Sequence, residues 1–120
     1  LVRMCACRGT AGFAHVSCLA EQAKILWTEV EGTNLDWNVK NEKWRRWDTC
    51  SLCEQRYHGV VACALSWACW KTYVGRSEAD EARGWAMGLL GSGLHDAHCY
   101  TDAAILYEAM ISMLRRVGAS

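Results

Sequence analysis

The chain has 120 residues with 13 basic and 13 acidic side chains, so its formal net charge is zero. This balance excludes a global field that would recruit nucleic acid or an anionic membrane. A chain of this length forms one domain or two small units and buries only roughly two thirds of its unfolded surface, so metal ions or neighbouring segments are expected to help fix it. It opens at Leu1 without a signal-peptide pattern, and we expect it to be part of a longer, intracellular, cytoplasmic protein.

No proline occurs, and glycine falls mainly where the apolar periodicity breaks. This pattern predicts a mainly α fold, with helices closed by glycine and one irregular segment near the N-terminus. The longest apolar stretch, Val60 to Trp70, is only about half of the roughly 20 residues that cross a bilayer, so no membrane span is expected.

The first segment, residues 3–12, has no helical or strand period and is expected to be a metal-ligand loop. It opens the pattern C-x-C-x7-H-x2-C, which is followed after a long gap by C-x2-C. Thiolate and imidazole are zinc ligands, and each cluster is too small to hold an ion alone, so the pattern predicts that the fold brings them together. The residues concerned are Cys5, Cys7, His15, Cys18, Cys50 and Cys53.

Eight cysteines in so short a chain also suit a disulfide scaffold. Pairs spaced C-x-C and C-x2-C bridge internally only with strain, and a histidine lies among them, which favours zinc. The plain structural alternative is that the cysteines are buried thiols without a metal.

Two helices are expected after this loop. In residues 17–30 the apolar side chains recur at steps of three and four, which predicts a helix that ends at Gly32. A weaker helical pattern covers residues 39–47, where Trp44 and Trp47 are expected to pack against the metal loop.

Three helices are expected in the rest of the chain. Residues 54–74 are apolar on most sides and should form a strut enclosed by other helices, with Cys63 and Cys69 as core thiols. Helices at about 78–97 and 101–117 should then form an antiparallel hairpin, with Ser77 and Thr101 at the N-terminal ends and Gly118 at the C-terminal end.

The N-terminal ligand pattern resembles the RING-CH (variant RING) zinc domain, whose ligands read C-x2-C, C-x-C-x7-H-x2-C and C-x2-C, separated by spacers. The six residues match the third to eighth ligands. The resemblance implies one complete zinc site made by Cys5, Cys7, Cys50 and Cys53. It also implies a half site made by His15 and Cys18, whose C-x2-C partner is not in this sequence.

Residues 84–117 resemble a tetratricopeptide (TPR) repeat of the kind found in kinesin light chains. The packing positions of that family are held here by Leu90, Gly91, Leu94, Tyr100, Ala103 and Tyr107. The alternative is an ordinary amphipathic hairpin. If the resemblance holds, the chain divides into a partial RING-CH-like module (1–57), a connecting helix (58–77) and a TPR-like hairpin (78–120) that is the first of several repeats.

Three further clusters have a possible functional role and a simpler structural explanation. His95, His98 and Cys99 could hold a metal, but a solvated turn is favoured. The basic residues around Trp44 and Trp47 mix charge with stacking surface, yet acidic neighbours favour a solvated face over nucleic-acid binding. Gly88, Gly91 and Gly93 are better explained by helix packing than by phosphate binding. No catalytic constellation stands out, so no catalytic residue is assigned.

The leading hypothesis is a zinc-stabilised protein-interaction module whose TPR-like groove binds protein partners. By analogy with RING-CH proteins, the whole protein would be a ubiquitin ligase that docks a ubiquitin-conjugating enzyme, while these 120 residues are expected to be inactive. The alternatives are a non-catalytic TPR scaffold with a structural zinc cluster, and a redox or metal-buffering protein with exposed thiols.

Overall fold

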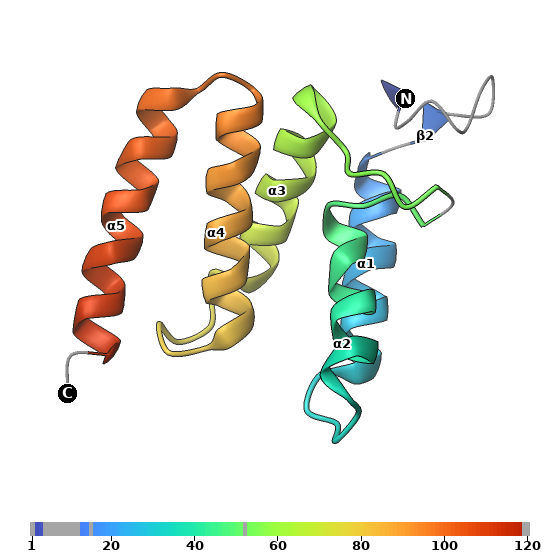
Figure 1. The fold of residues 1–120 in the computed structure, drawn as a ribbon, viewed down its shortest axis with the longest axis horizontal. Helices are drawn as coiled ribbons and strands as arrows, with labels where there is room; N and C mark the ends of the chain where they lie inside the picture. The colour runs from blue at the N-terminus through green and yellow to red at the C-terminus, as the bar shows by residue number, and fades with distance from the viewer. Residues whose placement is uncertain (1, 4–12, 15, 52, 119–120) are drawn as a thin grey trace. The chain divides into compact units, whose positions relative to one another are not determined.

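The computed structural model describes residues 2–3, 13–14, 16–51 and 53–118 of the chain. These residues are mainly helical, which confirms the mainly α character that the sequence predicts (Figure 1). The chain divides into two compact units, residues 1–57 and 58–120, and each is considered by itself. None of the described helices is both long enough and apolar enough to cross a membrane.

The described part of unit 1 contains two helices, a short 3-10 turn and a small strand pair. Strands β1 (Val2–Arg3) and β2 (Phe13–Ala14) pair antiparallel, and they precede helix α1 (Val16–Val30). Helix α2 (Trp37–Trp44) follows and continues into the 3-10 turn η2 (Arg45–Trp47). The expected helix 17–30 is therefore confirmed, and the expected helix 39–47 begins two residues earlier and tightens in its last turn.

Helix α1 packs against α2 and η2 through tryptophan rings. Trp27 meets Trp44 edge-on at 5.2 Å between ring centroids, and Trp44 lies 6.4 Å from Trp47. Trp47 is 1% exposed, and Ala23 and Val30 of α1 are also buried. Edge-to-face rings at this separation attract each other beyond the area they bury, so the indoles join the two helices. Their expected contact with the metal loop concerns residues outside the described part of the chain.

Helix α1 ends where the sequence predicts. Gly32 has a φ of +79°, a conformation that glycine adopts without steric cost. The Thr33 hydroxyl donates to the carbonyl of Val30 at 2.7 Å, which satisfies an acceptor in the last turn of the helix.

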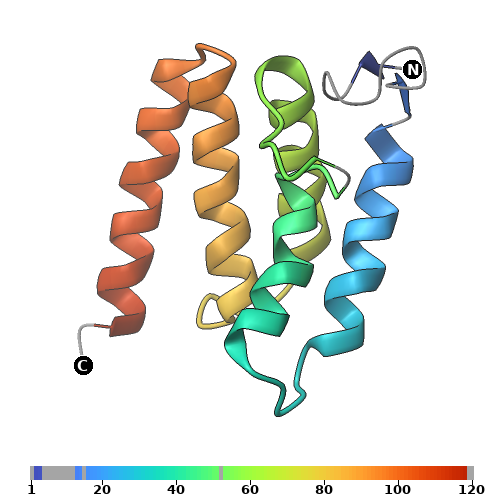
Figure 2. The ribbon, with the colours of Figure 1, turned by 45° about the vertical axis from the view of Figure 1, so that its right-hand side comes forward.

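Unit 2 is a row of three helices, α3 (Gly59–Tyr73), α4 (Glu81–Asp96) and α5 (Tyr100–Gly118). Helix α4 lies between the other two, and successive helices run in opposite directions (Figures 1 and 2). The core beside α5 is formed by Leu90, Leu94 and Ala103, with Leu106 and Tyr107 packed against it. The hairpin of α4 and α5 thus covers the region where two helices were expected.

Glycines allow α4 to approach both neighbours closely. A Cβ added at Gly93 would lie 2.8 Å from the Cβ of Ser66 on α3, and one at Gly91 would lie 2.6 Å from the ring of Tyr107 on α5. Such separations are too short for real atoms, so hydrogen at these positions is what permits the packing. Glycines in α4 serve helix packing at these two contacts, as the sequence predicts.

Two helices of unit 2 begin later than expected. The helix expected from Glu54 begins at Gly59, because residues 49–57 form a tight turn closed by a Thr49–Arg56 bridge and by the Tyr57 N–H donating to the Asp48 carbonyl. The helix expected from about residue 78 begins at Glu81. Its N-cap is Asp80 rather than Ser77, because the Asp80 carboxylate accepts the N–H of Arg83 at 3.0 Å.

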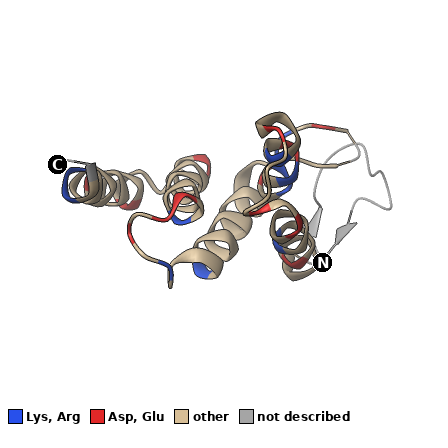
Figure 3. Cartoon of the chain, turned by 90° about the horizontal axis from the view of Figure 1, so that it is seen from below, with Lys and Arg blue, Asp and Glu red and all other residues tan. Residues whose placement is uncertain are grey.

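Helix α3 is less enclosed than its composition predicts. Its buried apolar residues form one stripe, Val61, Leu65, Cys69 and Tyr73, whereas Val60 and Trp67 are 77% and 42% exposed. Cys69 is a core thiol as expected, but Cys63 is only half-buried. Lys71 is the single charged residue of α3, so this helix is almost entirely tan in Figure 3. Both basic and acidic residues occur on α2 and α4.

Candidate functional site

Three of the six predicted zinc ligands are among the described residues. Cys5, Cys7 and His15 lie outside the described residues. Cys18 is exposed in the first turn of α1, and Cys50 and Cys53 lie in the turn that follows η2. Among the described residues, no group of three or more His, Cys, Asp or Glu side chains could hold a metal ion. The predicted four-thiolate site therefore stays a prediction.

Cys50 and Cys53 share a compact turn, residues 49–56, which we call the cysteine turn. Its ends pair at Thr49 and Arg56, and the Cys50 N–H donates to the Gln55 carbonyl at 2.9 Å. The Glu54 N–H donates back to the Cys50 carbonyl at 2.9 Å. These bonds bring Glu54 and Gln55, which follow Cys53, back to Cys50.

Glu54 reverses the chain directly after Cys53. Its φ is +59°, in the left-handed region that costs a non-glycine residue about 1 kcal/mol or more. Such a conformation persists only where surrounding interactions hold it. For Glu54 they come from its backbone N–H, which donates to the Cys50 carbonyl, and from its side chain.

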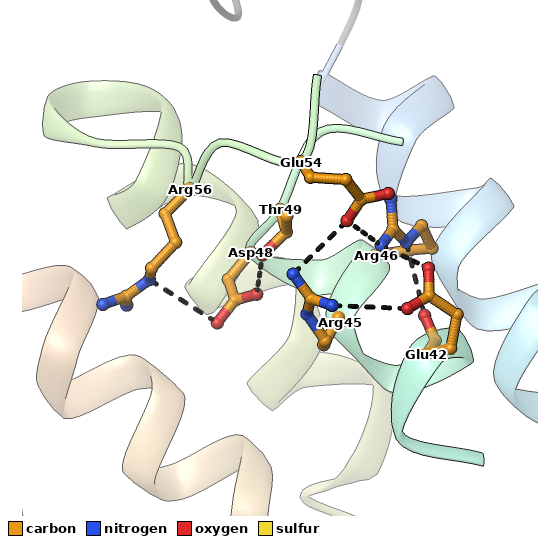
Figure 4. Close-up of polar contacts among 7 residues, drawn as sticks. All are labelled: Glu42, Arg45, Arg46, Asp48, Thr49, Glu54 and Arg56. Carbon is orange, nitrogen blue, oxygen red and sulfur yellow. Dashed lines mark hydrogen bonds and ion pairs between the residues drawn. The ribbon is translucent and has the colours of Figure 1, made fainter. Parts of the chain in front are cut away.

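An ion-pair network anchors Glu54 to the end of α2 and to η2 (Figure 4). The Glu54 carboxylate accepts from Arg46 at 3.0 Å and pairs with Arg45 at 3.3 Å. Both arginines also reach Glu42, at 2.9 Å from Arg46 and 3.3 Å from Arg45. The Arg46 side chain is only 9% exposed, so this arginine joins the turn to the packed part of unit 1.

The network favours the ionised form of Glu54. The hydrogen bond from Arg46 holds the pKa of this carboxyl below its ordinary value of 4.5, and the charges of Arg46 and Arg45 act in the same direction. At neutral pH the turn therefore keeps its anchor, which weakens only when acid protonates Glu54.

The start of the turn has its own polar contacts. The Thr49 hydroxyl donates to the Asp48 carboxylate at 2.7 Å, and Arg56 lies 3.9 Å from the same carboxylate. Cys50 has no exposed surface, and Cys53 is half-buried. Two thiols at C-x2-C spacing in a closed turn fit half of a tetrahedral zinc site by the chemistry of their donors. The other half would have to come from outside the described residues.

Unit 2 carries a surface hollow of about 340 Å³ between the first turns of α4 and the last turns of α5. Apolar side chains, Trp85, Met110, Met113, Leu114 and Val117, line most of it. Its remaining side chains include three carboxylates, Glu78, Asp80 and Glu81. Arg116 pairs with Glu78 at 3.0 Å and Arg76 with Asp80 at 3.5 Å, so these two carboxylates are partly neutralised.

The histidines of the turn between α4 and α5 interact with Tyr100. The Nδ1 of His98 lies 2.6 Å from the Tyr100 hydroxyl, and the His95 ring meets Tyr100 edge-on. These two histidines and Cys99 do not form a group that could hold a metal ion, and no such group occurs among the described residues.

In the basic and aromatic stretch, Arg45 and Arg46 are committed to carboxylates and Trp47 is buried. Trp44 is half-buried and packs against Trp27 and Trp47. The role of Glu54 was missed from the sequence. The i,i+3 and i,i+4 spacing of Glu42 to Arg45 and Arg46 was a usable local signal, but no local rule links them to Glu54.

Comparison with known proteins adds no relative. No protein-family model, no curated protein and no solved structure matches this chain. Function is therefore argued from the residues and their geometry alone.

Proposed function

We propose that the chain is a protein-interaction module in which the hollow between α4 and α5 binds a peptide segment of a partner. The observation that carries this proposal is the hollow itself, where Leu114 is 56% exposed beside Met110 and Trp85. Apolar side chains gathered in a concavity mark binding surfaces more often than single exposed residues do.

The lining of the hollow indicates the chemistry of its occupant. Every charged residue that lines it is acidic, and Glu81 lies in the first turn of α4 beside the apolar floor. A segment that presents a large apolar side chain next to a lysine or arginine complements both features. The TPR resemblance supports the same kind of ligand, since repeats of that type bind extended or helical peptides.

The test is selection from a random peptide library displayed on phage, followed by affinity measurement on the purified chain. Leu114→Lys places a cation in the hollow and should weaken the selected peptides at least about tenfold. Ile105→Lys is the matched control, because Ile105 is 60% exposed on the same helix but does not line the hollow. Equal losses in both variants, or no loss in either, would refute the docking site.

We further propose that zinc organises unit 1 through Cys5, Cys7, Cys50 and Cys53, as the RING-CH resemblance implies. The closed cysteine turn supports this, because it presents Cys50 and Cys53 from one loop at zinc-binding spacing. Zinc there would supply a cross-link that contributes to folding rather than to catalysis. Cys18 and His15 would belong to a second, incomplete site.

Elemental analysis of the purified chain tests this part. One zinc per chain is expected, lost in Cys50→Ser and Cys53→Ser and kept in Cys99→Ser, which removes an exposed thiol from unit 2. Circular dichroism before and after chelation should show loss of structure only in the chains that hold zinc. A metal-free wild type that keeps its full ellipticity would exclude a structural zinc.

The proposed role in the whole protein is that of a ubiquitin ligase whose repeats hold substrates. This chain carries six of the eight ligands in the RING-CH pattern, so residues 1–120 alone should not support ubiquitin transfer. Binding of a ubiquitin-conjugating enzyme to the longer protein separates the ligase from the second candidate, a scaffold with a purely structural zinc cluster.

A further inference from the structure

Two cysteines from separate segments of unit 2 lie beside the same apolar cluster. Cys63, in α3, packs against the cluster that contains Leu94 and Ala103. Cys99 lies in the turn between α4 and α5, where its N–H donates to the Leu94 carbonyl at 2.8 Å and its carbonyl accepts the Ala103 N–H at 3.0 Å. Cys63 thus contacts this cluster through its packing, and Cys99 is bonded to two of the cluster's members.

The two thiols differ in access to solvent. Cys99 is exposed, with its Sγ 3.8 Å from the Ala97 carbonyl, whereas Cys63 is half-buried. Burial raises the pKa of the Cys63 thiol, and the charge of the Cys99 thiolate raises it further. This electrostatic influence agrees with the packing, in which Cys63 contacts the cluster whose Leu94 and Ala103 are bonded to Cys99.

The turn holds Cys99 in this place through its own backbone. His98 has a φ of +63°, and the N–H groups of Ala97 and His98 donate to the carbonyls of Gly93 and His95 at 3.1 and 2.9 Å. A turn closed by successive bonds to the last residues of α4 leaves the residue after it little freedom. Cys99 is thus held at the start of α5, beside the core that Cys63 contacts.

We propose that Cys63 and Cys99 are a redox modification site, which closes to a disulfide by exchange with a low-molecular-weight disulfide. The Cys99 thiolate attacks one sulfur of the oxidant RS–SR, which forms Cys99–S–SR and releases one thiolate that takes up a proton. The Cys63 thiolate then attacks the Cys99 sulfur, the protein disulfide forms and the second thiol leaves. The two protein thiols lose two electrons in all, and the external disulfide gains them.

The closed bridge joins α3 to the start of α5 across α4. It constrains the unfolded chain over the segment that includes the whole of α4, so the oxidised protein should unfold at a higher temperature. This proposal is independent of the peptide hollow and of zinc, since both cysteines lie in unit 2 and neither lines the hollow.

The test oxidises the full zinc-supplemented chain with glutathione disulfide and maps it by mass spectrometry without reduction. Trypsin places Cys63 in peptide 57–71 and Cys99 in peptide 84–115, so a single linked pair of these peptides is expected. Fragmentation must assign the link to Cys63 rather than to the fully buried Cys69 of the same peptide. The melting temperature should rise by at least about 8 °C and return on reduction.

Variants make the test specific. Cys99→Ser should abolish both the linked peptides and the thermal shift, and it changes an exposed residue, so the fold is kept. Cys18→Ser, an exposed thiol of unit 1, should leave both unchanged. The proposal is overturned if Cys99 accumulates only as a mixed disulfide with glutathione while Cys63 stays open to alkylation. It is equally overturned if the bridge forms with Cys69.

Discussion

Replacing Gly93 by alanine should separate α3 from α4. The added Cβ would lie 2.8 Å from the Cβ of Ser66 and 3.2 Å from the carbonyl oxygen of Ala62, and it would also collide with the Ser66 hydroxyl. Ser66 cannot easily turn away, because its hydroxyl is buried and donates to the Cys63 carbonyl at 2.7 Å. Relief therefore requires the two helix backbones to move apart.

The size of the effect follows from two opposing contributions. Overpacking of a close helix contact costs about 1–3 kcal/mol, and contacts with a second backbone put this site in the upper part of that range. Alanine gains about 1 kcal/mol over glycine inside a helix. The free energy of unfolding should fall by about 1–2 kcal/mol. In a domain of this size each kcal/mol lowers the melting temperature by roughly 4–8 °C.

Gly88→Ala is the matched control, since it makes the same substitution in the same helix where an added Cβ meets nothing within 4 Å. Chemical denaturation should show this variant to be more stable than wild type by about 0.5–1 kcal/mol. Adding Ser66→Gly to Gly93→Ala removes the colliding atoms and should restore at least about 1 kcal/mol in a double-mutant cycle. If both alanine variants stabilise the chain equally, the close packing of α3 on α4 is wrong.

Three other expectations concern the same unit. Asp80→Asn should keep most of the capping bond to the Arg83 N–H, whereas Asp80→Ala should cost about 1 kcal/mol in urea denaturation. Leu65→Ala should cost about 2–5 kcal/mol, because Leu65 has no exposed surface, and a loss below about 1 kcal/mol would show that the site is not a packed core. The hydrogen bond from Arg116 lowers the pKa of Glu78 below 4.5, so the contribution of this pair is present above the unfolded pKa and is lost as the pH falls through the folded one. The difference in melting temperature between wild type and Glu78→Gln should therefore shrink between about pH 6 and about pH 3, and a constant difference would show that the pair does not act on stability.

The local sequence predicts part of the cysteine turn correctly and part of it wrongly. The spacing of Cys50 and Cys53 predicts that both belong to one ligand pair, because two residues between thiols suit a tight loop. The sequence also predicts a helix from Glu54, because the apolar residues that follow dominate the pattern, and this prediction is wrong, since α3 begins at Gly59. The Thr49–Arg56 bridge and the left-handed Glu54 overrule that local preference, and they depend on arginines several residues away.

The sequence by itself determined where helices form, wherever apolar residues recur at helical spacing or helix-ending residues are present. Apolar steps of three and four placed α1, whereas the hairpin of α4 and α5 followed from the expected end residues and from the absence of proline. A helix repeats its faces along its own length, so this information is local. It does not include which apolar face is buried: α3 looked enclosed on all sides, yet Val60 and Trp67 are exposed.

Only the tertiary structure decided which distant residues meet. Gly93 opposite Ser66, Cys63 against the cluster that includes Ala103, and Arg116 on Glu78 all depend on the register of one helix against another. That register is set by the summed packing of many side chains, so no short stretch encodes it. For this reason the composition indicated helices and thiols, whereas the pairs on which the proposals rest appeared only once the helices were packed.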